Sequence, residues 1–180
     1  MADARTDDAL GPEELETYLV LTEAVSMLQY AVEEQLRAAG GLSGVQFQIL
    51  TRLAFTGGPL TMTELADGIV YSRSGLTYQA GLLEKAGLIT RTPSPDDERV
   101  TLTAITDEGR ARVAQVMPGH VELVRRLFLA PLDERDLRGL REIMTRVRDH
   151  MRNRPPRSVV ARKRRAAPGA GGSGRGGDGR

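Results

Sequence analysis

The segment LTMTELADGIVYSRSGLTYQAGLLEKAGLITR, residues 60–91, contains two short capped helices in succession. Thr61 and Glu64 have the spacing of a capping box, which starts a helix of about two turns. Ser72 is a suitable cap for a second helix, and Gly87 is placed to end that helix in the left-handed conformation. Two short helices separated by a tight turn are typical of the helix-turn-helix motif.

A hairpin is predicted directly after this motif, because the periodicity of the apolar residues changes from helical to alternating. LITRT, residues 88–92, and RVTLTA, residues 99–104, are the two expected strands. PSPDDE, residues 93–98, is rich in Pro and Asp and is the expected turn. Three residues of the second strand are expected to share the face toward the core: Val100, Leu102 and Ala104.

A long helix is predicted from Pro12 to about Ala39, with proline at its first position and glutamates in its first turn. Six apolar residues recur along it at near-helical spacing: Leu15, Leu19, Val25, Leu28, Val32 and Leu36. At 1.5 Å per residue this helix would be ~40 Å long. A small compact domain rarely needs that length, so part of the apolar stripe is expected to face another subunit.

Three more helices complete the expected organisation. GLSGVQFQILTRLA, residues 41–54, has Ser43 and Gln46 at capping-box spacing, with Leu42 and Phe47 as a hydrophobic staple. The next helix is expected to start at Thr106, which precedes two acids, and to kink or break at Pro118-Gly119. The last helix is expected to start at the cap Asp133 and to carry an apolar stripe formed by Leu137, Leu140, Met144, Val147 and Met151.

The composition excludes several classes of protein. The chain has no cysteine, which excludes disulfides and thiolate metal sites, and its two histidines, His120 and His150, are far apart in sequence. No catalytic triad, Cys-His pair, metal cluster or phosphate-binding glycine loop is present, so we expect neither an enzyme nor a metal or cofactor. The first ten residues lack the apolar stretch of a signal peptide, and no uncharged apolar run approaches the ~20 residues that cross a bilayer. A soluble cytoplasmic protein is expected.

The charge is unevenly distributed although the net charge is only +1. Residues 154–180 hold seven Arg and one Lys against one Asp, which gives +7 and leaves −6 for residues 1–153. This Pro-, Gly- and Arg-rich tail is expected to be disordered. It could be a non-specific DNA tether, a solubility tail or a segment without function.

The hairpin also carries a signature, Asp97-x-Arg99 followed six residues later by Ile105-Thr106. With Gly-Leu-Ile before the hairpin and Asp-Glu-Gly after it, residues 42–110 resemble the MarR family of winged helix-turn-helix regulators, whose wing signature is D-x-R…L-T. Ile replaces the family's Leu. Gly81 stands where many relatives have an acid that can pair with the wing Arg, which makes Asp97 the main expected partner of Arg99.

The resemblance implies a mainly α fold with a small β-hairpin. A winged helix-turn-helix DNA-binding domain is expected over residues 42–106. A helical dimerisation region is expected from residues 12–40 and 107–153, with the helices of two subunits interleaved.

The resemblance further implies double-stranded DNA as a partner. Side chains expected in the major groove lie on the outer face of the second helix of the motif: Arg73, Ser74, Thr77, Tyr78 and Gln79. The wing would present Arg99 to the minor groove, with Asp97 fixing either the Arg99 side chain or the turn. Additional phosphate contacts are expected from Ser43, Thr61 or the wing residue Arg91.

Finally, the resemblance implies a homodimeric repressor that leaves a pseudo-palindromic operator when it binds a small aromatic or phenolic acid. The expected effector pocket lies between the two lobes: Met27, Tyr30, Phe47, Met117 and His120. The same residues are also typical of a helical core. Two alternatives stay open: a DNA-binding dimer without a ligand switch, and a helical protein-interaction module that has lost DNA binding.

Overall fold

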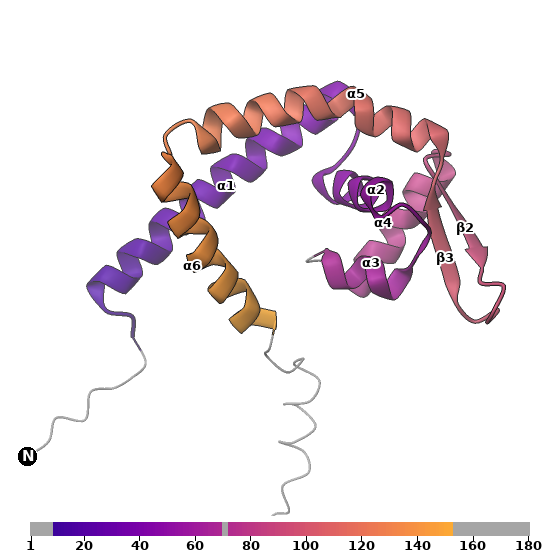
Figure 1. Cartoon of the computed structure of the whole chain (residues 1–180), viewed down its shortest axis with the longest axis horizontal. Coiled ribbons are helices and arrows are strands. Elements are labelled where there is room, and N and C mark those ends of the chain that lie inside the picture. Colours follow the sequence, from indigo (N-terminus) through magenta and orange to yellow (C-terminus); the bar gives the residue numbers. More distant parts are fainter. Residues whose placement is uncertain (1–8, 70–71, 153–180) are drawn as a thin grey trace, which may run out of the picture. The chain divides into compact units, whose positions relative to one another are not determined.

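The computed structural model describes residues 9–69 and 72–152, without the side chains of residues 68 and 73. The helices and strands follow in this order: α1 (Pro12–Gly40), α2 (Gly44–Thr56), β1 (Leu60–Thr61), α3 (Met62–Gly68), α4 (Arg73–Lys85), β2 (Ile89–Pro93), β3 (Thr101–Ile105), α5 (Asp107–Val124), the π-helical turn η1 (Arg125–Leu129) and α6 (Glu134–Arg152) (Figure 1). Two compact units result, one ending at Pro131 and one that begins at Leu132 and contains α6.

Among the described helices, none has the length and apolar character required to span a membrane. The predicted tail, residues 154–180, lies outside the described residues.

Polar caps start the helices where the sequence predicts them. Each of four hydroxyl groups accepts the backbone N–H of the residue three positions later, with these oxygen–nitrogen distances: 3.3 Å for Ser43, 3.2 Å for Thr61, 3.1 Å for Ser72 and 3.0 Å for Thr106. The predicted cap of α6 is also confirmed, since Asp133 accepts the N–H of Asp136 at 2.8 Å. Gly87 ends α4 with φ = 72°, a conformation that glycine adopts without a Cβ clash.

The three strands form one antiparallel sheet in the order β1-β3-β2. Strand β1 is not predicted from the sequence because it has only two residues, and it pairs Leu60 with Thr103. The hairpin of β2 and β3, with its connecting loop, is called the wing below. In Figure 1 the wing lies beside α4, and its loop points away from α5.

The predicted inward face of β3 is wrong. Thr103 is fully buried, whereas Val100, Leu102 and Ala104 are only half-buried. The wing turn ends at Val100, whose N–H donates to the carbonyl of Asp97 at 2.9 Å, so the strand starts at Thr101. Side chains alternate faces along a strand, and this register turns Thr103 inward, where its hydroxyl donates to the sulfur of Met62 at 3.6 Å.

The hydrophobic core joins the end of α1 to the helix-turn-helix motif. The predicted inward residues of α4 are confirmed, since Leu76, Ala80 and Leu83 are each at most 1% exposed. They pack in one cluster with fully buried residues of the neighbouring helices: Leu36 of α1, Leu50 and Leu53 of α2, Leu65 of α3 and Val116 of α5.

Side chains of α5 also bind the last carbonyl groups of α1. Arg112 Nη1 donates to the carbonyl of Gly40 at 2.7 Å, and Gln115 Nε2 donates to the carbonyl of Ala39 at 2.7 Å. In the other direction, Gln35 Nε2 of α1 donates to the carbonyl of Val116 at 3.2 Å. Of the predicted kink or break at Pro118-Gly119, the break is wrong, since helix α5 continues through Pro118 while packed against α1.

Candidate nucleic-acid interface

Helix α4 presents a polar face to solvent. Ser74, Thr77 and Tyr78 are exposed, and the Tyr78 side chain is 65% exposed, so these three predicted contact residues share one accessible face. Gln79 is half-buried, and its Oε1 is buried without a hydrogen-bond partner among the described residues. The side chain of Arg73 lies outside the described residues. The structure therefore brings three of the five predicted residues to the outer face and turns the Gln79 carbonyl inward.

The turn of the wing is held by Asp97. Its Oδ1 accepts the backbone N–H of Arg99 at 3.0 Å, and its own carbonyl accepts the N–H of Val100. Of the two roles considered for Asp97, the structure shows the one in which it fixes the turn. The exposed guanidinium of Arg99 has no ion pair or hydrogen bond within residues 9–69 and 72–152. This cation is accordingly held on an ordered turn and is available to an anionic partner.

The second wing arginine, Arg91, is bound by α4. Its Nε donates to Oε2 of Glu84 at 2.8 Å, and its Nη2 forms an ion pair with the same oxygen. These hydrogen bonds lower the pKa of Glu84 below its ordinary value of 4.5. The guanidinium also lies near Gly81, where an added Cβ would be 3.9 Å from Nη2.

Glu84 is a residue that the sequence analysis missed. The signal that could have found it is its position three residues after Gly81, which places both on one face of a helix. Gly81 lacks the acid that could meet a wing arginine, and Glu84 supplies one from the next turn.

The hydroxyl groups of Ser43 and Thr61, predicted as phosphate contacts, already act as helix caps. Each completes a capping box, because the side chain of Gln46 or Glu64 accepts the backbone N–H of the cap at 3.0 Å or 2.7 Å. Thr61 also donates its hydroxyl to Glu64 at 2.8 Å, and hydrogen bonds from Thr61 lower the pKa of Glu64 from 4.5. Their phosphate contacts stay a prediction.

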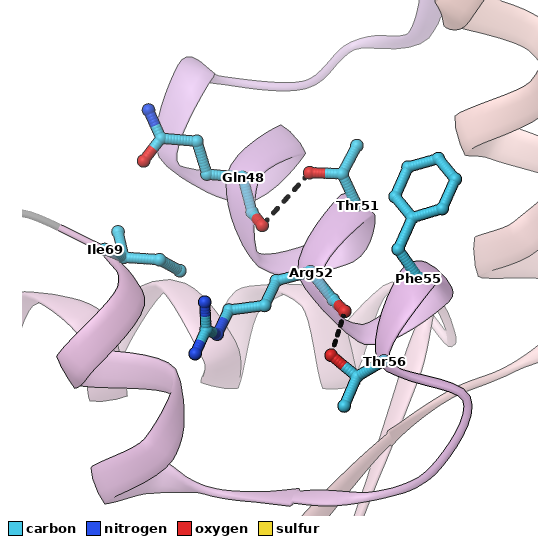
Figure 2. A pocket seen from close by; sticks show the side chains of 6 residues that line it. All are labelled: Gln48, Thr51, Arg52, Phe55, Thr56 and Ile69. Carbon is cyan, nitrogen blue, oxygen red and sulfur yellow. Dashed lines mark hydrogen bonds between the residues drawn. The ribbon is translucent and has the colours of Figure 1, made fainter. Parts of the chain in front are cut away.

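The outward face of α2 forms an open hollow of about 440 Å³ that the sequence analysis did not anticipate. It is lined by six residues: Gln48, Thr51, Arg52, Phe55, Thr56 and Ile69. Figure 2 shows the Arg52 guanidinium directed toward Ile69 and the Phe55 ring pointing away from both. Arg52 Nη2 donates to the carbonyl of Glu64 at 3.2 Å, so Arg52 joins α2 to α3 and fixes the first helix of the motif.

The arrangement of capped helices and wing agrees with the comparison with known proteins. The sequence model described as MarR family matches residues 40–100. Over 114 residues the chain is 33% identical to the HTH-type transcriptional regulator PecS of Dickeya dadantii (strain 3937), a span that covers 62% of this chain and 68% of PecS. The chain belongs to the MarR family. Its relatives are transcriptional regulators, which confirms the prediction that it is not an enzyme.

Solved structures of MarR-family regulators from Streptomyces coelicolor have the same winged-helix fold. Sco3205, solved in complex with DNA, gives a TM-score of 0.78 at 31% identity and covers 83% of this chain and 92% of its own. AbsC gives a TM-score of 0.77 at 28% identity and covers 81% of this chain and 99% of its own. The predicted mainly α fold with a small β-sheet is confirmed.

In this MarR-family protein, two of the predicted effector residues are in direct contact. The rings of Phe47 and His120 have centroids 4.8 Å apart and planes inclined by 56°. Met117 lies on the same helix as His120 and packs against the core. Met27 and Tyr30 are both 67% exposed on α1, and the Tyr30 hydroxyl donates to Glu34 at 3.0 Å.

Met27 instead lines a separate cavity of about 360 Å³ between α1 and η1. All the residues that line this cavity are apolar in type, and the others are Ala24, Leu28, Ala31, Leu127 and Phe128. Within the first compact unit, the five predicted effector residues therefore fall into two groups rather than one pocket.

Two buried polar atoms near His120 lack partners among the described residues, and one of them was not predicted. His120 Nδ1 is unpaired, and so is Oε1 of Gln35 on α1. Gln35 lies against Gly119, the residue before His120, where an added Cβ would be 2.9 Å from Nε2 of Gln35. Buried polar atoms are nearly always paired in native proteins. A ligand or water that reaches either atom would complete the hydrogen bonding of that residue.

Acid is expected to destabilise the fold through His120. Burial lowers the pKa of His120 from 6.5, so the unfolded chain binds a proton more readily than the folded chain. The contribution of neutral His120 to the free energy of unfolding is fully present above about pH 6.5. It is lost as the pH falls from that value toward the lower pKa of His120 in the folded chain. The pKa values of Glu64 and Glu84 lie below 4.5, outside this range. Melting temperatures at about pH 7.5 and 5.5 should fall more for the wild type than for His120→Gln. Equal decreases would contradict this role.

Proposed function

We propose that this MarR-family protein is a cytoplasmic homodimeric repressor that binds a pseudo-palindromic DNA operator and releases it when a small aromatic molecule binds. The observation that carries the proposal is the exposed Arg99 guanidinium on a turn fixed by Asp97, beside the exposed polar face of α4. A helix of this kind fits the major groove, and an arginine at a wing tip fits the negative potential of the minor groove. The relative Sco3205, which was solved with DNA, supports the same partner.

Dimerisation is supported by apolar side chains that the single chain leaves in solvent. In the N-terminal half of α1, Leu15, Leu19 and Val25 are 45%, 54% and 42% exposed, although they follow a helical stripe. On α6, Met151 is 66% exposed. Contiguous exposed apolar surface marks an interaction site, and a second copy of the chain would bury it. Residues 12–40 and 107–153 would then form the dimerisation region, and residues 42–106 the DNA-binding domain.

An effector site at Phe47 and His120 is supported by the unpaired polar atoms there. An aromatic molecule with a hydroxyl or carboxyl group could stack on these rings and bond to His120 Nδ1 or Gln35 Oε1. The three residues belong to α2, α5 and α1, so the ligand would contact helices of the proposed dimer region and the DNA-binding domain together. Binding one arrangement of these helices more tightly would shift the population away from the DNA-competent form.

The proposal is tested by a mobility shift with the DNA that flanks the protein's own gene, with and without aromatic acids. Light scattering in parallel should give the mass of a dimer. We expect a shifted band that aromatic acids release. A shift that no acid changes would favour a DNA-binding dimer without a ligand switch. A dimer that shifts no DNA would favour an interaction module.

Asp97 allows a sharper test of the wing. Because its carboxylate accepts one backbone N–H and does not bind the guanidinium of Arg99, an amide oxygen should serve equally well. Asp97→Asn is therefore expected to keep operator affinity near that of the wild type, whereas Asp97→Ala should weaken it roughly three- to tenfold. Fluorescence anisotropy with a labelled operator measures both. Equal losses in the two variants would show that the negative charge matters, and the role in the turn would be wrong.

A further inference from the structure

The contact between Glu84 and Arg91 joins the wing to the recognition helix α4. Two nitrogen atoms of the guanidinium bind one carboxylate oxygen, which fixes the orientation of the planar group. The two side chains are 27% and 37% exposed, so the pair is partly shielded from solvent. Glu84 lies in the last turn of α4, and Arg91 is the central residue of β2.

The register of the sheet carries this attachment to the whole wing. Arg91 pairs with the fully buried Thr103 of β3, and it lies on the same side of β2 as buried Ile89. Its neighbours Thr90 and Thr92 are exposed on the opposite side. The side chain of Arg91 is therefore directed to α4 from the middle of the hairpin, while Arg99 stands on the loop at its far end.

The same geometry affects what Arg91 can do with DNA. Its Nε and Nη2 are both engaged by Glu84, and the carboxylate neutralises its charge. A phosphate would have to compete with a bound carboxylate at close range, whereas Arg99 has no such competitor within the described residues.

We propose that Glu84 is a positioning residue for DNA recognition, because it holds Arg91 as a strut between α4 and the wing. The strut sets the position of Arg99 relative to the outer face of α4, and Arg91 makes no phosphate contact of its own. This inference rests on the proposed operator binding.

The test compares three variants of the full chain: Glu84→Ala, Arg91→Ala and the exchanged pair Glu84→Arg with Arg91→Glu. Operator affinity is measured between roughly 50 and 200 mM salt, a range in which each lost phosphate contact lowers the slope of log K against log salt by about 0.9. Both single variants should weaken binding roughly three- to tenfold with an unchanged slope. The exchanged pair should recover affinity to within about twofold of the wild type. Thermal melts establish that each variant is folded.

Hydroxyl-radical footprints on the operator give a readout that a loss of stability alone would not move. Arg91→Ala should lose protection of the minor groove that flanks each half-site, while protection within the half-sites remains. The inference is overturned if the slope for Arg91→Ala falls by about 0.9, if Glu84→Ala binds more tightly with a steeper slope, or if the exchanged pair recovers nothing. A wild-type chain that binds no operator would overturn the proposed function and this inference with it. Normal operator binding with any of the three outcomes would overturn the inference alone.

Discussion

Arg99→Ala is expected to weaken operator binding by about 10- to 100-fold, the usual effect of removing one arginine that reaches into a groove. The guanidinium is exposed, and it has no partner within the described residues that would have to be broken before it meets DNA. Its backbone is already fixed by Asp97, so little backbone conformational entropy is lost on binding. The slope of log K against log salt should decrease by about one if the contact includes a phosphate.

Fluorescence anisotropy across a salt series measures both quantities. Arg135→Ala is a matched control, because Arg135 is exposed on α6 and forms no ion pair or hydrogen bond among the described residues. It should leave affinity within about twofold of the wild type. Unchanged affinity for Arg99→Ala, with the operator still bound, would remove the wing tip from the interface.

Gly109→Ala is expected to cause the largest loss of stability, about 3 kcal/mol or more, at the upper end of the range for overpacked cores. An added Cβ would lie 2.1 Å from the carbonyl oxygen of Leu88 and 2.7 Å from Cγ1 of Ile105. The carbonyl oxygen is part of the backbone and already accepts the N–H of Thr106 at 3.1 Å, so it cannot move aside without breaking that bond. Helix α5 can therefore start against the wing only because residue 109 has no side chain.

Thermal melts at fixed protein concentration test this expectation, since a dimer's melting temperature depends on concentration. A decrease of roughly 10 °C is expected for a chain of this size. Gly58→Ala is the control, because its Cβ would meet nothing within 4 Å and its φ is not positive. Its effect should stay within about 0.5 kcal/mol. If the two variants melt alike, the close approach at Gly109 is not tight in solution.

Local signals in the sequence predict the helices well, because a cap and its acceptor are only three residues apart. Ser43, Thr61, Ser72 and Thr106 each start a helix where they are expected to, and Gly87 ends one. The wing is predicted for the same reason, since its turn residues and alternating β-formers are contiguous. The signature that includes Arg99 also predicts the correct family.

Non-local features are missed. The inward face of β3 depends on which residue ends the preceding turn, and a shift of one position exchanged Leu102 for Thr103. Strand β1 exists only because β3 pairs with it. The bond between Glu84 and Arg91 depends on how β2 packs against α4, which no local pattern encodes. The exposed state of Met27 depends on the packing of α1, which its helical spacing alone does not reveal.

The hydrogen bonds from Arg112 and Gln115 to the last carbonyl groups of α1 have a mechanical consequence. They clamp the C-terminal end of α1 to α5, and the first turn of α5 is seated on the backbone of Leu88 at the base of the wing. Helices α1 and α5 should consequently move as one rigid unit that carries the exposed half of α1 at one end and the wing at the other. A partner that binds and displaces the exposed half of α1 would thereby rotate the wing.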